Sequence, residues 1–109
     1  MKWVPEHARQ AIVKPSAALA IHRAALRQLV ARYGLLSPRV FGSVVTHTDT
    51  EDSDLDLLVE PVQGSTTLLT LGGLKVDAEA LLGVRVDVLT PGFLSPKFRD
   101  IVLQYAEPL

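Results

Sequence analysis

Hydrophobic residues recur at steps of three and four positions over residues 15–33, which is the period of an amphipathic helix. Pro15 suits the first turn of such a helix, and Gly34 is a typical residue at its end. The same spacing predicts a second helix over residues 66–82 and a third over residues 95–105. The pattern therefore indicates three helices separated by other elements.

A second pattern, the alternation of apolar and polar residues, marks the strands. Residues 84–89 alternate in this way, and short runs at residues 39–41 and 54–59 are bounded by turn residues. Because only the polar loop of residues 43–53 joins the first two runs, we expect those strands to be antiparallel neighbours. The order helix, strand, strand, helix, strand, helix predicts an α/β fold with a small mixed β-sheet and helices packed mainly on one face.

The two ends of the chain carry weaker patterns. Residues 1–14 are expected to form an N-terminal arm beside a single domain of residues 15–109, and contact of Trp3 with a partner or a second protomer is the alternative. Residues 108–109 are expected to be a tail. Three arginines fall off the apolar stripe of the first helix and are expected to face solvent: Arg23, Arg27 and Arg32.

Composition narrows the function classes. Hydrophobic residues make up 48% of the 109 residues, enough for a core, yet no apolar run approaches the roughly 20 residues of a membrane span. The net charge of −1 argues against direct, sequence-independent nucleic-acid binding, which normally needs a basic excess. There is no cysteine and no signal-peptide pattern, so no disulfide is expected and a cytoplasmic location is the default expectation.

Two aspartates two residues apart are the first candidate chemistry. Asp54 and Asp56 lie in a predicted strand, where alternate side chains share a face and Cα atoms two apart are about 6.5–7 Å from each other. Carboxylates so placed can converge on one divalent cation or on two. The plain alternative is the solvated face of an edge strand.

Other polar residues extend this candidate site. Gly42-Ser43, at the end of the first strand, lets the backbone approach a phosphate and offers amide and hydroxyl donors. Ser53 could steady the loop before the aspartates. Asp87 is an acidic residue in a β-branched strand, where aspartate is depleted, although a surface charge pair with Arg85 is the simpler interpretation of Asp87 alone.

The combined spacing is distinctive. Gly42-Ser43, nine intervening residues and then Ser53-Asp54-Leu55-Asp56-Leu57 resembles the signature of the DNA polymerase β-like nucleotidyltransferase superfamily. With its short length, the chain looks like the minimal nucleotidyltransferases, whose MntA-like members are the antitoxin halves of pairs with HEPN-domain toxins. The resemblance covers roughly Arg39 to the C-terminus.

The resemblance implies a polymerase β-like palm fold and Mg²⁺-dependent transfer of AMP from ATP to a tyrosine of a HEPN ribonuclease toxin. It implies two Mg²⁺ ions, with Asp87 as the third carboxylate. The residues it assigns are Asp54, Asp56 and Asp87 as catalytic and metal-binding, and Gly42, Ser43 and Ser53 as nucleotide-binding. Two positions depart from the family pattern, because Val44 stands where many members carry Arg and His47 where they carry Gly.

Alternatives remain open at this point. A non-catalytic antitoxin on the same fold would neutralise its partner by binding alone, and retention of the three aspartates argues for the enzyme. A small-molecule nucleotidyltransferase subunit is less favoured, because the chain lacks the C-terminal helical extension that relatives use for such acceptors. A homo-oligomer is compatible with the sequence.

Overall fold

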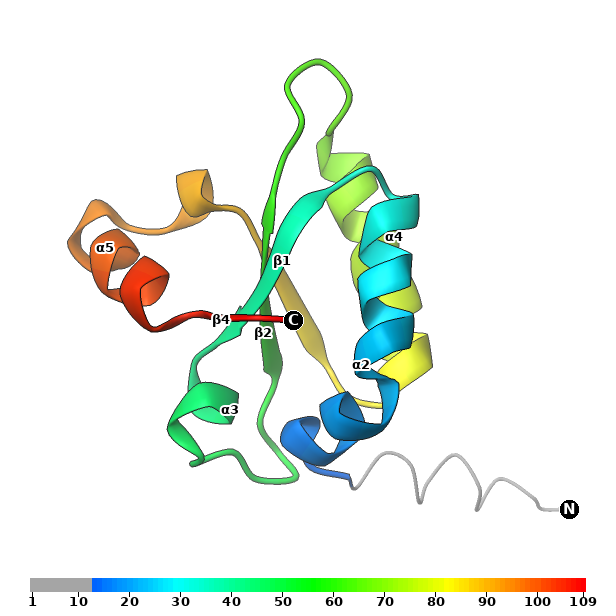
Figure 1. Cartoon of the computed structure of the whole chain (residues 1–109), viewed down its shortest axis with the longest axis vertical. Coiled ribbons are helices and arrows are strands. Elements are labelled where there is room, and N and C mark those ends of the chain that lie inside the picture. The colour runs from blue at the N-terminus through cyan, green and yellow to red at the C-terminus, as the bar shows by residue number, and fades with distance from the viewer. Residues whose placement is uncertain (1–12) are drawn as a thin grey trace, which may run out of the picture.

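The computed structural model describes residues 13–109, so Trp3 and nearly all of the predicted N-terminal arm lie outside the described residues (Figure 1). The predicted helices and strands are all present, and three short elements are added between and after them. In chain order the elements are α2 (Pro15–Arg32), β1 (Leu36–Phe41), α3 (Ser43–Thr46), β2 (Leu55–Glu60), α4 (Leu68–Leu82), β3 (Val86–Leu89), the 3-10 helix η1 (Pro91–Phe93), α5 (Pro96–Tyr105) and β4 (Glu107–Pro108).

The strands form one mixed four-stranded sheet in the order β3-β2-β1-β4. The expected antiparallel pairing of β1 with β2 is confirmed, and β3 lies parallel to β2 on its other side. The prediction of a free C-terminal tail is wrong, because β4 pairs with β1, where Arg39 lies opposite Pro108. The reason is a long-range backbone pairing that leaves no local pattern in the sequence.

The C-terminus is held by side chains of α2 as well. Arg23 Nη1 donates to the carbonyl of Pro108 at 3.2 Å, and Arg27 Nη1 donates to a C-terminal oxygen of Leu109 at 3.0 Å. The prediction that these arginines face solvent holds for Arg27 and Arg32, which are exposed, whereas Arg23 is partly buried. These contacts fix β4 against the edge of the sheet.

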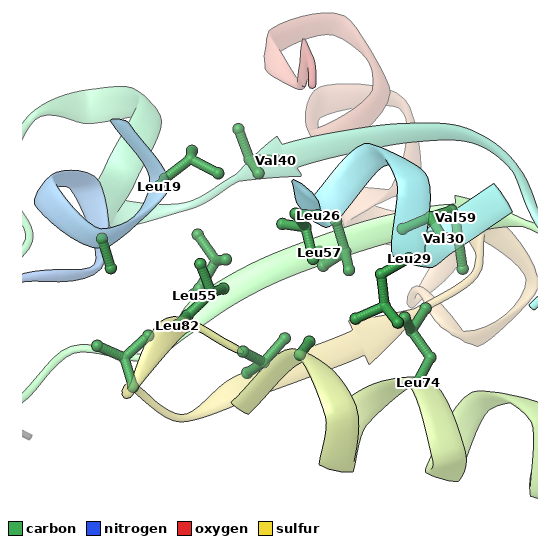
Figure 2. Packing of buried hydrophobic residues seen from close by; sticks show 14 of the residues in the cluster. Leu19, Leu26, Leu29, Val30, Val40, Leu55, Leu57, Val59, Leu74 and Leu82 are labelled. Carbon is green, nitrogen blue, oxygen red and sulfur yellow. The ribbon is translucent and has the colours of Figure 1, made fainter. Parts of the chain in front are cut away.

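Helices α2 and α4 cover one face of the sheet, whereas α5 lies on the other side (Figure 1). The core fills the space between α2, α4 and the sheet, as Figure 2 shows, and alternate residues of β2 point into it. The fully buried residues of this layer include Leu26, Val30, Leu55, Leu57, Val59 and Leu74. Because β2 alternates, Asp56 faces away from these helices, toward the side of the sheet where α5 lies.

Helix α5 differs from the other long helices in burial. None of its residues is buried, and the three large residues on its apolar side are more than half exposed: Phe98, Ile101 and Tyr105. None of the helices in residues 13–109 combines the length and apolar character that crossing a membrane requires.

Candidate active site

The turn after β1 is shaped by Gly42. Its φ of 79° lies in the left-handed region that favours glycine, and a Cβ at this position would collide with Oδ2 of Asp56. Phe41, the last residue of β1, lies opposite Asp56 in the antiparallel register. The Gly42-Ser43 turn therefore lies against the Asp56 carboxylate. The two parts of the sequence motif, which are separated in the chain, are neighbours in the structure.

The polar segment that follows is more ordered than the predicted loop. Ser43 begins the short helix α3, which ends at His47 with a left-handed φ of 61°. Further on, the Ser53 hydroxyl accepts a hydrogen bond from the backbone N–H of Thr50 at 2.9 Å. Ser53 thus steadies the loop as expected, whereas its contact with a nucleotide remains a prediction.

Asp49 in this loop has a structural role that sequence reasoning missed. It is buried and accepts a hydrogen bond from the backbone N–H of Ser16 at 2.9 Å, in the first turn of α2. Burial alone would raise the pKa of Asp49, but hydrogen bonds from Ser16 outweigh it, and the pKa is lowered. No local signal could reveal this cap, because the two residues are far apart in the chain.

Asp56 and Asp87 lie side by side on the parallel strands β2 and β3. In-register side chains of neighbouring strands share a face, so both carboxyl groups occupy the side of the sheet away from α2 and α4. Burial, and after it the negative charges of Asp87 and Asp54, together raise the pKa of Asp56 to about 6. The half-buried Asp56 therefore sits where a cation would be favourable.

Asp54 lies just before β2 and is engaged by a cation from the chain itself. Its Oδ1 is 2.8 Å from Nε of Arg85, a contact with the distance of an ion pair but without hydrogen-bond alignment. Nη2 of Arg85 also donates to the backbone carbonyl of Asp52 at 2.9 Å. Arg85 thus pairs with Asp54. The surface pair of Arg85 with Asp87, which was the simpler interpretation of the sequence, does not form.

Strand β3, which carries Asp87, is the edge of the sheet and is tied to α4. The Glu79 carboxylate accepts hydrogen bonds from the backbone N–H of Val86 at 3.0 Å and from Lys75 Nζ at 2.9 Å. Lys75 also donates to the carbonyl of Val86 at 2.7 Å. The hydrogen bond from the Val86 N–H lowers the pKa of Glu79. Burial raises this pKa, but Lys75 lowers it as well, and the net shift is downward. This clamp, which sequence reasoning missed, fixes the backbone next to Asp87.

The chemistry of these residues fits a hard divalent cation. Asp54, Asp56 and Asp87 offer carboxylate oxygens, the ligands that Mg²⁺ prefers, and their mutual repulsion raises the pKa of Asp56. Within residues 13–109, however, no three acidic, histidine or cysteine side chains are close enough together to hold a metal as they stand. The three aspartates are electrostatic neighbours, while Asp54 is turned to Arg85.

Comparison with known proteins assigns the chain to a family. The Nucleotidyltransferase domain family matches residues 21–109. The chain belongs to the nucleotidyltransferase family. The family predicted from the sequence is therefore confirmed. The mixed α/β fold described above is consistent with it.

Individual relatives agree with this assignment. A Methanocaldococcus jannaschii chain assigned as a protein adenylyltransferase, MJ0435, is 37% identical over 78 residues, covering 72% of this nucleotidyltransferase and 83% of the relative. Protein adenylyltransferase MntA of Thermococcus cleftensis is 37% identical over 86 residues, covering 79% of this chain and 83% of the relative. A solved structure assigned as a minimal nucleotidyltransferase has a TM-score of 0.77 and 47% identity, covering 86% of this chain and 95% of that one.

The two departures from the family pattern have structural explanations in this nucleotidyltransferase. Val44 is buried in the hydrophobic core, so its position supports packing of α3. His47 adopts the left-handed conformation that glycine adopts readily, and histidine is among the residues that tolerate it. The backbone shape is therefore kept at His47, whereas Val44 offers no charge to a phosphate.

Proposed function

We propose that this nucleotidyltransferase transfers AMP from ATP, in a Mg²⁺-dependent reaction, to a tyrosine of a HEPN-type ribonuclease toxin and acts as its antitoxin. The observation that carries the proposal is the in-register pair of Asp56 and Asp87 beside the Gly42 turn. Relatives that are 37% identical are named protein adenylyltransferases, which supports a protein acceptor. A toxin–antitoxin structure with AMP-PNP shares the fold at a TM-score of 0.63 and 19% identity. We place the reaction in the cytoplasm, where ATP is available.

Each residue of the candidate site has a distinct role in the proposed reaction. The amides of the Gly42-Ser43 turn and the Ser43 hydroxyl donate to phosphate oxygens of ATP, and Ser53 holds the neighbouring loop in place. Asp54, Asp56 and Asp87 would hold Mg²⁺, which when bound neutralises the charge that develops on the phosphates. The acceptor oxygen attacks the α-phosphorus, the bond to the β-phosphate breaks, and pyrophosphate leaves. Asp87, exposed on the edge strand, accepts the proton of the acceptor hydroxyl.

A second candidate function is an antitoxin that binds its partner without chemistry. The exposed apolar side of α5 favours it, because large apolar side chains gathered on one surface are typical of protein contacts. The same surface is compatible with the enzyme, which also has to engage a protein acceptor. Chemistry therefore has to be tested separately from binding.

The decisive experiment is incubation of the full chain with its co-encoded toxin, Mg²⁺ and ATP labelled at the α-phosphate. The expected result is a toxin that gains the α-phosphate label and the mass of one AMP unit per modified tyrosine, whereas ATP labelled at the γ-phosphate should transfer no label. EDTA should prevent the modification, and it should weaken ATP binding in calorimetry. A toxin that is inhibited but unmodified contradicts the enzyme and supports the binding antitoxin.

A further inference from the structure

Arg85 is anchored at three points to residues 52–55, which lead into β2. Its Nε lies 2.8 Å from Oδ1 of Asp54, and its Nη2 donates to the carbonyl of Asp52 at 2.9 Å. Its own carbonyl accepts the backbone N–H of Leu55 at 2.8 Å. Arg85 is therefore held across one side of the site by both its side chain and its backbone, directly before the strand that carries Asp87.

We propose that Arg85 is a built-in counter-ion of the active site, which holds Asp54 in the nucleotide-free protein and is displaced when metal-bound nucleotide enters. This inference rests on the proposed function, because it assumes that Asp54 is a metal ligand. Asp54 Oδ1 has no hydrogen-bond partner in residues 13–109, so the guanidinium is the group that balances this oxygen. A guanidinium and a metal ion at the same carboxylate oxygen repel each other, so the two contacts compete.

Physical chemistry favours a contact that competition can release. Arginine stays protonated at all ordinary pH values, so a change of pH leaves the Arg85 charge in place and only a stronger cation can replace it. The Arg85 side chain is 71% exposed, so it is already largely hydrated and can move into water. The Asp54 side chain is 37% exposed, although its Oδ1 is buried, and an ion pair with so exposed a guanidinium is weak enough to open.

The other ion pairs of the described chain do not have this character. Arg39 pairs with Glu60 at 2.6 Å, and Lys75 pairs with Glu79 at 2.9 Å, and in both pairs the carboxylate accepts a true hydrogen bond. Neither pair includes a residue of the candidate site. The Arg85–Asp54 contact is therefore the ion pair in residues 13–109 that closes on the site itself.

One consequence is that metal and nucleotide should bind cooperatively. Free metal has to displace Arg85 with no compensation, whereas metal that arrives with a triphosphate brings negative charge that the released guanidinium can face. Arg85 thereby disfavours the binding of metal alone and favours the binding of the metal–nucleotide complex. Reciprocity of linked binding requires each ligand to raise the affinity for the other by the same factor.

The test measures Mn²⁺ binding to the full chain by electron paramagnetic resonance, without nucleotide and with a non-hydrolysable ATP analogue. Without nucleotide, Arg85→Gln should bind Mn²⁺ about three- to five-fold more tightly than the wild type. The increase in Mn²⁺ affinity caused by the analogue should be smaller in Arg85→Gln than in the wild type. Arg85→Lys, which keeps the charge, should stay close to the wild type.

Lys97→Gln is the matched control, because it removes the same charge from an exposed residue of α5. Its Mn²⁺ affinity should equal that of the wild type, and melting in EDTA checks that each variant folds. Unchanged or weaker Mn²⁺ binding by Arg85→Gln, with normal binding of metal and analogue by the wild type, overturns the counter-ion role alone. Failure of the wild type to bind Mn²⁺ even with the analogue overturns the metal site of the proposed function, and the counter-ion role with it.

Discussion

Asp49 and Asp56 lie in the same short stretch of chain, and the fold treats them in opposite ways. Asp49 is buried and satisfied, since it accepts a hydrogen bond from the first turn of α2. Asp56 is half-buried beside two other carboxylates, and its pKa is raised to about 6. Asp49 is more acidic than usual because the fold supplies hydrogen-bond donors, and Asp56 is less acidic because the fold buries it and places like charge beside it.

The difference separates structure from function. A carboxylate that is buried and hydrogen-bonded inside the protein contributes to stability and is poorly placed to meet a ligand. A carboxylate held among like charges lowers stability, and the energy is recovered when a cation binds. The position of Asp56 next to Gly42 and Asp87 is therefore better explained by a ligand than by folding.

The largest expected effect comes from Asp56→Asn, which keeps the shape of the side chain and removes its charge. Nucleotidyl transfer should fall by about 100-fold or more, because a proposed metal ligand is lost. The free energy of unfolding at pH 8 in EDTA should stay equal or rise, on the order of 1 kcal/mol after solvent screening. Transfer assays and thermal melts measure the two effects, and a destabilised but active variant would place Asp56 in the same class as Asp49.

Asp87→Asn tests the exposed partner on β3. We expect transfer to be lost, while the stability in EDTA stays equal or rises because repulsion with Asp56 is relieved. The rise in melting temperature caused by Mg²⁺ should shrink, because a weaker ligand set binds less metal. Activity close to that of the wild type would show that Asp87 is not part of the site and does not bind the metal together with Asp56.

Asp49→Ala should show the opposite profile. Loss of the hydrogen bond to the first turn of α2 should lower the free energy of unfolding by about 1–2 kcal/mol, the usual effect of removing a helix cap. Transfer measured well below the melting temperature should persist, since Asp49 contacts a helix end. Urea denaturation and a transfer assay on the same preparation check both statements. Loss of transfer with unchanged stability would contradict the division between the two aspartates.

Local patterns explain why so much of the fold and site could be predicted. The helices α2, α4 and α5 follow from apolar periodicity, and the Gly42 turn and the pair of Asp54 and Asp56 follow from a spacing that is short in sequence. Adjacent elements of this kind depend mostly on nearby residues. The neighbouring positions of Asp56 and Asp87 needed one further step, the parallel pairing of β2 with β3.

Most of the features that could not be predicted depend on distant partners. The Asp49 cap, the pairing of β4 with β1 and the choice of Asp54 by Arg85 each join segments that are far apart in the chain. The helix α3 has four residues, which is too short to show a period. The Lys75–Glu79 spacing is visible in the sequence, but nothing there links the pair to Val86.

The smallest expected effect is the most specific one, a pair of opposite pH dependences. The raised pKa of Asp56 means that the native protein holds this proton more tightly than the unfolded chain, so stability from this group is present at low pH and is lost as pH rises from about 4 to about 6. The lowered pKa of Asp49 gives the reverse: its contribution is present above its ordinary pKa and is lost as pH falls through the lowered native value. In EDTA, the stability of Asp56→Asn relative to the wild type should therefore increase from pH 4 to pH 7, by on the order of 1 kcal/mol. The loss of stability of Asp49→Asn relative to the wild type should be largest at pH 7 and should decrease toward pH 3. Because each curve is a difference from the wild type, titration of groups that do not interact with the replaced aspartate cancels. Parallel curves would show that the two carboxylates do not differ in the way their surroundings require.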